Sequence, residues 1–201
     1  MGEQYFTKDP TSESREAVAT WEHGGKTVEF VTDRGVFSRG HVDFGSRLLV
    51  ASLPPLHGRV LDLGCGYGFV GVAVGLTHPG VAELVLCDVN ARALALARRN
   101  AARHGVAVTC LESDGFAAVE GTFDAILTNP PVRAGKAVYY PWFAEAARRL
   151  RPGGALYLVL QRKQGAPSAQ KHLEGLFADV TVLERDAGYH ILRAADPRTE
   201  V

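Results

Sequence analysis

Short apolar segments typical of β-strands alternate with helix-like segments from Arg59 onward, and this alternation restricts the fold more than any other feature. The expected strands cover 60–63, 84–87, 106–111, 123–128, 155–160, 180–183 and 189–193. The expected helices cover 70–76, 91–104, 141–150 and 169–177. Because neighbouring parallel strands need a long crossover, usually a helix, the alternation predicts an α/β fold with right-handed crossovers.

The predicted sheet is Rossmann-like and doubly wound, with seven mostly parallel strands. Only residues 184–188 separate the last two strands, which is enough for a hairpin but too little for a helical crossover. One strand near the C-terminus is therefore expected to run antiparallel.

The segment before the alternating region has a pattern of its own. Residues 27–31 and 36–37 are β-prone and flank a turn that ends in Gly35, which predicts a hairpin. A helix is expected over 44–53, where apolar residues recur on one face until Pro54-Pro55 stops it.

A chain of 201 residues suits one domain with a small addition, and its first 20 residues are polar and irregular. We therefore expect an extension of residues 1–58, a hairpin and a helix, packed on a core domain of residues 59–201. There is no apolar core for a signal peptide and no stretch long enough to span a membrane, so the expected location is the cytoplasm.

Charge and cysteine content exclude some classes of function. Lys+Arg and Asp+Glu both number 22, which does not indicate a globally basic nucleic-acid binder but leaves room for a local basic patch. The three cysteines, Cys65, Cys87 and Cys110, lie far apart without a C-x-x-C motif. We interpret them as small buried thiols, and expect neither a disulfide framework nor a metal site.

A glycine-rich loop, residues 62–71, follows the first strand of the alternating region, where open α/β sheets bind ligands. Within it, Gly66, Gly68 and Gly71 match the dinucleotide pattern G-x-G-x-x-G, and Asp88 stands where an acidic residue would meet a ribose. By that pattern alone, a nicotinamide or flavin enzyme is a candidate.

Asp62 favours a different nucleoside ligand. A carboxylate inside the strand is awkward beside a pyrophosphate but suits a ligand with a cationic amino group. The run Asp62-x-Gly64-x-Gly66-x-Gly68 resembles the first motif of the class I S-adenosylmethionine-dependent methyltransferases. This resemblance covers roughly residues 59–194 and implies S-adenosylmethionine as the cofactor.

A second motif, Asn129-Pro130-Pro131, follows the strand expected at 123–128. Each proline fixes its own φ and biases the preceding residue away from helix, so the turn is stiff and extended. Such a turn can accept hydrogen bonds from a planar N–H donor, or it can be a rigid strand end without chemistry. It resembles the N-P-P-[FYW] motif of methyltransferases that act on amines.

The resemblance implies a role for each motif residue. The implied catalytic residues are Asn129, Pro130 and Pro131. The implied cofactor-binding residues are Phe37, Asp62, Gly64, Cys65, Gly66, Gly68, Asp88, Val89, Asp114, Gly115 and Asn129. Among these, Asp88 would bind the ribose hydroxyls and Asp114 would lie near the adenine amino group.

The acceptor chemistry suggests a mechanism. An exocyclic amine shares its lone pair with the ring and is a poor nucleophile. Hydrogen bonds from its N–H groups to the Asn129 side-chain oxygen and the Pro130 carbonyl would localise that lone pair and aim it at the sulfonium methyl group. The amine proton becomes acidic once the methyl group is transferred, so no strong base is needed.

The chain departs from the family motif at Val132, where relatives carry an aromatic residue that stacks on the target base. Candidates to replace that aromatic are Phe116, Tyr139, Tyr140 and Trp142, each of which fits a core position equally well.

A closer resemblance rests on three segments, 35–38, 43–49 and 129–136. Together they are similar to the short, single-domain members of the small-subunit ribosomal RNA guanine-N2 methyltransferase family. This likeness implies that Phe37 and the 43–49 segment close over the cofactor. It also places Val132, Arg133 and Lys136 at the substrate mouth, where the two cations would contact phosphates.

The larger relatives carry an extra N-terminal domain that this sequence lacks, so the resemblance implies RNA or ribosomal-subunit capture by the catalytic domain or a homodimer. Two groups of arginines are either RNA contacts or solvated helix faces. They are Arg92, Arg98, Arg99 and Arg103, and Arg148, Arg149 and Arg151.

The leading interpretation is an N-methyltransferase acting on guanine in ribosomal RNA. The alternatives are the same chemistry on a protein glutamine or an adenine, a nicotinamide-dependent oxidoreductase, and a non-catalytic RNA-binding module.

Overall fold

The computed structural model of the protein describes residues 12–198. The irregular conformation expected for residues 1–11 lies outside the described residues.

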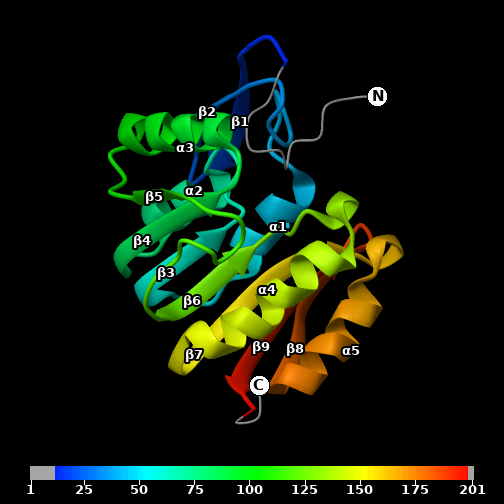
Figure 1. The fold of residues 1–201 in the computed structure, drawn as a ribbon. Coiled ribbons are helices and arrows are strands. Elements are labelled where there is room, and N and C mark those ends of the chain that lie inside the picture. Colours follow the sequence, from blue (N-terminus) through cyan, green and yellow to red (C-terminus); the bar gives the residue numbers. More distant parts are fainter. Residues whose placement is uncertain (1–11, 199–201) are drawn as a thin grey trace.

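A seven-stranded sheet forms the centre of the molecule, in the order β5-β4-β3-β6-β7-β9-β8 (Figure 1). Its strands are β3 (His57–Leu63), β4 (Gly80–Asp88), β5 (Thr109–Glu112), β6 (Phe123–Thr128), β7 (Leu150–Gln161), β8 (Phe177–Asp186) and β9 (Tyr189–Pro197). Strand β9 runs antiparallel to both of its neighbours, and the pairings among β3 to β7 are parallel. The predicted doubly wound sheet with one antiparallel strand is confirmed.

Helices cover both faces of this sheet (Figure 1). They are α1 (Phe44–Ser52), α2 (Phe69–Thr77), α3 (Ala91–Arg103), α4 (Lys136–Arg149) and α5 (Ala166–Leu176). Side chains of α1, α2 and α3 form one hydrophobic cluster with the sheet, and those of α4 and α5 form a second cluster on the other face. Two buried layers of this kind are what a parallel sheet with helical crossovers requires.

Helix α4 begins earlier than the sequence pattern predicts. The pattern predicts a start at Pro141. The helix instead begins at Lys136, directly after the short 3₁₀ helix η1 (Val132–Ala134), and contains Pro141. Pro141 is the sixth residue of α4, beyond the first turn whose N–H groups have no helical partner, so it removes one helical bond, the one to the Ala137 carbonyl.

The N-terminal hairpin differs from the prediction. It joins β1 (Ala17–His23) to β2 (Lys26–Thr32), and residues 36–37 are not a strand. Gly24 and Gly25 have φ of 55° and 73° and provide the two positive φ values that a two-residue turn needs. The predicted turn is instead a loop around the buried Asp33, whose carboxylate accepts from Ser14 Oγ at 2.7 Å and from the Arg34 N–H at 2.7 Å.

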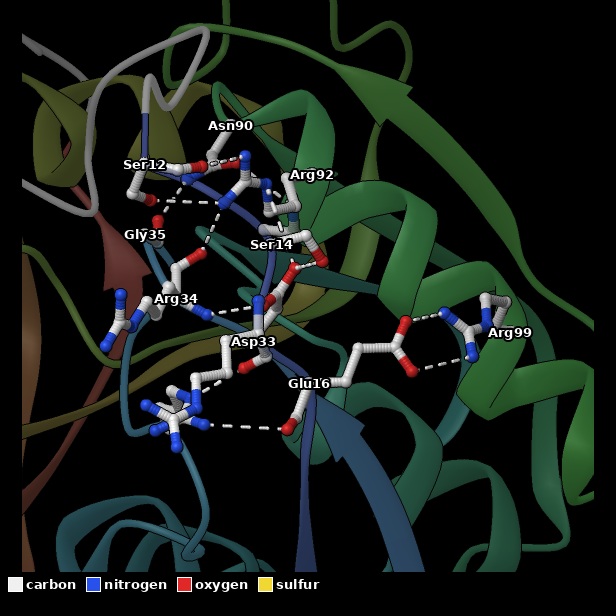
Figure 2. A network of polar contacts seen from close by, with 12 residues as sticks. Ser12, Ser14, Glu16, Asp33, Arg34, Gly35, Asn90, Arg92 and Arg99 are labelled. Atoms are coloured by element: carbon white, nitrogen blue, oxygen red, sulfur yellow. Dashed lines mark hydrogen bonds and ion pairs between the residues drawn. The ribbon is translucent and has the colours of Figure 1, made fainter.

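The arginines of α3 hold the N-terminal segment against the core (Figure 2). Arg92 donates to the Ser12 carbonyl at 2.7 Å and to the Arg34 carbonyl at 2.8 Å. Arg99 pairs with Glu16, and Arg103 pairs with Glu29. These side chains have intramolecular partners, which weakens their interpretation as RNA contacts.

The remaining arginines of the two predicted groups are also engaged within the chain. Arg98 donates to the Cys110 carbonyl at 3.2 Å. Arg148 and Arg149 pair with Glu145, and Arg151 pairs with Asp124.

Strand β3 begins at His57, so the division predicted between the extension and the core domain, at residues 58 and 59, falls inside this strand and stays a prediction.

Asn100 of α3 joins β2 to the glycine loop, and its replacement by alanine should destabilise the protein. Its buried amide donates to the Val31 carbonyl at 3.0 Å and the Tyr67 carbonyl at 2.8 Å, and accepts from the Val31 N–H at 2.8 Å. Since Asn100→Ala leaves these backbone groups without partners, we expect unfolding free energy to fall by about 3 kcal/mol in urea titrations. Arg99→Ala, which removes only an exposed ion pair, should leave the unfolding midpoint nearly unchanged. Equal midpoints for the two variants would contradict this account.

Candidate active site

A cavity of about 470 Å³ opens at the carboxyl ends of β3, β4 and β6. The chain winds away from β3 in both directions, to β4 on one side and β6 on the other, and ligands of open α/β sheets bind at such a switch point. The glycine loop after β3 and the Asn-Pro-Pro turn after β6 therefore meet in one place.

Asp88, at the end of β4, is held rigidly beside the glycine loop. One carboxylate oxygen accepts from the Gly66 N–H at 2.8 Å and the other from the Asn90 N–H at 2.9 Å. Burial raises the pKa of this carboxyl despite these bonds. Each oxygen keeps a further lone pair, so the group fits a diol such as that of a ribose.

Asp62 is buried under the same loop and lines the cavity. Its Oδ2 accepts from the Gly71 N–H at 2.8 Å. Burial, and in smaller part the nearby Asp88, raises the pKa of Asp62 to about 7. A cationic group bound in the cavity would stabilise the ionised form of this buried carboxyl, so the site fits an amino acid amine.

An aromatic wall closes the cavity beside Asp114 and Gly115. A Cβ atom at Gly115 would lie 2.4 Å from Trp142 Nε1, and one at Gly64 would lie 3.5 Å from the same ring. The φ of Gly115 is 54°, which favours glycine. Trp142 thus packs across both glycines and offers an apolar surface to a flat ring.

Asn129 is oriented by the first turn of α1. Its Nδ2 donates to Ser46 Oγ at 2.9 Å and to Asp43 Oδ2 at 3.1 Å. The same Asp43 oxygen caps α1 by accepting from the Ser46 N–H at 2.9 Å. Because a carboxylate can only accept, the amide nitrogen must face Asp43, and Oδ1 is left to accept from a ligand.

The prolines after Asn129 form a tight turn. Pro131 has φ −75° and ψ 73°, values of an inverse γ-turn, and the Val132 N–H donates to the Pro130 carbonyl at 2.8 Å. That carbonyl, predicted as an acceptor for the substrate, keeps one lone pair for it.

The cavity brings together most of the predicted site residues. Those that line it are Phe37, Asp62, Gly64, Gly66, Asp88, Val89, Asp114, Gly115, Asn129, Pro130, Pro131, Val132 and Arg133. Cys65, Gly68 and Lys136 do not line it. The roles of the lining residues stay predictions.

The three residues outside the cavity wall have structural contacts instead. Cys65 is buried. Gly68 begins α2 with φ 89°, and a Cβ there would lie 3.0 Å from Ala97. Lys136 lies over the Tyr140 ring, 5.7 Å from its centroid.

The four candidates for the aromatic residue that is absent at position 132 differ in where their side chains lie. Phe116 and Tyr139 are buried in the core, and Tyr140 stacks on His172 at 4.4 Å. Among the four, Trp142 lines the cavity.

Among the side chains of the cavity wall that sequence reasoning missed are three polar ones that lie at or after the end of β7, or at the start of β9, namely Gln161, Gln164 and Tyr189. The pairing of β9 with β7 sets Tyr189 opposite Gln161. No local motif indicates this pair, because it depends on the register between two strands.

The sheet and this site together define a Rossmann-like, S-adenosylmethionine-dependent methyltransferase. The family model described as Methyltransferase small domain matches residues 27–193, and the chain belongs to this family. S-adenosylmethionine is therefore the cofactor, and the nicotinamide interpretation is wrong.

The chain is similar to three known proteins over 90% or more of its length. An uncharacterized Bacillus subtilis protein, YbxB, is 41% identical over 96% of this chain and 98% of its own length. Ribosomal RNA small subunit methyltransferase C of Chromohalobacter salexigens is 37% identical over 90% of this chain and 55% of its own. The T. thermophilus 16S rRNA N2 G1207 methyltransferase, solved with AdoMet and guanosine, superposes with a TM-score of 0.80 at 30% identity, covering 92% of this chain and 51% of its own. The chain spans about half the length of these two ribosomal RNA methyltransferases.

No helix within residues 12–198 is long and apolar enough to cross a membrane.

Proposed function

We propose that this enzyme methylates the exocyclic amine of a guanine in ribosomal RNA. The observation that carries the proposal is the orientation of Asn129, whose amide nitrogen is held by Asp43 and Ser46 so that Oδ1 is left to accept. An accepting oxygen at this point suits a planar N–H donor. The names of two relatives, both ribosomal RNA methyltransferases, support guanine in RNA as that donor.

The side chains present suit transfer to a weak nucleophile. S-adenosylmethionine supplies an electrophilic methyl group on its sulfonium sulfur. Hydrogen bonds from the substrate amine to Asn129 Oδ1 and the Pro130 carbonyl turn its lone pair out of conjugation with the ring. The N–C bond then forms as the C–S bond breaks, and the acidified amine proton leaves to solvent. The contact with Asp43 makes Oδ1 a stronger acceptor, since hydrogen bonds in a chain polarise one another.

Substrate contacts are proposed for Val132 and Arg133, which line the cavity next to the Asn-Pro-Pro turn. Val132 offers an apolar face to the base, and Arg133 a cation to the RNA backbone.

Transfer of labelled methyl to undermethylated small ribosomal subunits tests the function. We expect N2-methylguanosine as the labelled nucleoside after digestion, with fully methylated subunits taking up no label. Naked ribosomal RNA assayed in parallel shows which form is the substrate. Label recovered in adenine or in a protein glutamine would overturn guanine as the acceptor.

A further inference from the structure

A second hollow of about 470 Å³ adjoins the catalytic cavity. It is lined by Gln161, Arg162, Lys163, Ala187 and Gly188, which come from the end of β7, the 3₁₀ helix η2 (Arg162–Gln164) and the turn between β8 and β9. Gln161 lines both the hollow and the catalytic cavity. A substrate strand that enters one is therefore within reach of the other.

A buried polar atom without a partner lies at this hollow. Within residues 12–198, three buried side-chain polar atoms lack a hydrogen bond, namely Arg59 Nε, Gln161 Oε1 and His190 Nδ1. Arg59 Nε lies 2.9 Å from a Glu83 carboxylate oxygen and so has an ion-pair partner. In the β7–β9 pairing Gln161 is opposite Tyr189 and Leu160 is opposite His190, so the Gln161 and His190 side chains point to opposite faces of the sheet. Of the two, Gln161 lines the hollow. Because buried polar groups are normally satisfied, its free Oε1 indicates a missing ligand there.

The cations around the hollow are also without partners. The side chains of Arg162 and Lys163, which line the hollow, form no hydrogen bond or ion pair with the rest of the described chain. Glu184 and Asp186 near the β8–β9 turn form no ion pair with them either. This contrasts with the arginines of α3, which bind acidic side chains and carbonyls.

We infer that this hollow binds a ribonucleotide that flanks the target guanine in the substrate strand. This inference rests on the proposed function. Its phosphate would be held by Arg162 and Lys163, since guanidinium and ammonium groups are the usual partners of the backbone. Its ribose 2′-hydroxyl would donate to Gln161 Oε1, which gives that atom the partner it lacks. The 2′-hydroxyl is the group that separates RNA from DNA.

The salt dependence of RNA binding tests the cationic part. Binding of a short single-stranded RNA is measured by fluorescence anisotropy across salt concentrations, with S-adenosylhomocysteine present. Replacing Arg162 and Lys163 together by glutamine should reduce the slope of log K against log salt by about 0.7, the amount expected for the loss of one phosphate contact. Lys26→Gln, an exposed cation at the β1–β2 turn, is the matched control and should keep the wild-type slope. An unchanged slope in the double variant would overturn the inference.

The 2′-hydroxyl contact has its own readout. In Gln161→Leu the preference for RNA over DNA of the same sequence should fall several-fold while the salt slope stays as in the wild type. Unaltered discrimination would remove Gln161 from the subsite. Calorimetry with S-adenosylhomocysteine checks that each variant is folded. If wild-type enzyme methylates guanine in RNA but the variants bind as the wild type does, the subsite alone is wrong; if its methyl group goes to a protein, the proposed function is wrong.

Discussion

Replacing Asn129 with alanine is expected to lower kcat for methyl transfer by about 100-fold to 1,000-fold, the range found when one preorganised hydrogen-bonding group at a reacting centre is removed. The substrate amine would lose the acceptor that localises its lone pair. Single-turnover assays at saturating cofactor and RNA measure the loss. Affinity for S-adenosylhomocysteine should fall by no more than about threefold, since the acidic residues of the cofactor side are intact.

Two variants separate the acceptor from its orientation. Asn129→Asp keeps Oδ1 and the size of the side chain but sets a second carboxylate against Asp43, so at neutral pH we expect a loss close to that of alanine. Ser46→Ala removes one of the two groups that hold Nδ2 and should cause a milder loss. Wild-type kcat in Asn129→Ala would refute the proposed role of the turn.

The fold was predictable from local patterns because each core element carries its own signals. Strand β6 has the predicted bounds, set by an apolar run that ends at Asn129. Asn90, a residue type favoured at the N-cap, caps α3 by accepting from the Ala93 N–H at 3.0 Å. The predicted position of the hairpin was wrong because this segment contains two glycine-containing turns. The chain turns at Gly24-Gly25, whose positive φ values suit a two-residue turn, and Asp33 lies in a loop beside Arg92 of α3.

The candidate site was predictable where a residue follows a strand. Asp62, Asp88 and Asn129 all come at or after strand ends, and the parallel sheet brings those ends together. The bond between Asn129 and Asp43 joins residues 86 positions apart, and no local pattern reports it. The contact of Gln161 with Tyr189, at 2.5 Å, likewise depends on the register of the antiparallel strand.

The contact between Asp43 and Asn129 also bears on the N-terminal extension. Asp43 belongs to the segment predicted as an addition to the core, yet its carboxylate fixes the amide at the proposed reaction centre. The extension thus supplies part of the site, in addition to the packing of β2 on α3.

Affinity for S-adenosylhomocysteine is expected to rise with pH up to about 7 and then to level off, because of Asp62. Burial raises the pKa of this carboxyl from 3.8 to about 7, and a bound cationic amine favours its ionised form. The complex therefore holds fewer protons than the free protein below pH 7, and binding releases protons. In the free protein the same carboxyl makes unfolding free energy fall as pH rises from about 4 to about 7, because the folded state binds more protons there. Calorimetry between about pH 5.5 and about pH 8.5, in buffers of different ionisation enthalpy, measures both affinity and proton release.

Asp62→Asn isolates this carboxyl from the histidines that titrate in the same range. Above pH 7 the variant should bind about 10-fold to 100-fold more weakly, the loss expected for one hydrogen bond to a charged group. Its affinity should no longer change between pH 5.5 and 7, and its proton release should disappear. Asp114→Asn, at an exposed carboxyl on the same cavity wall, should weaken binding but keep the pH dependence. A pH dependence that persists in Asp62→Asn would assign it to another group, and Asp62 would then not be the partner of the cofactor amine.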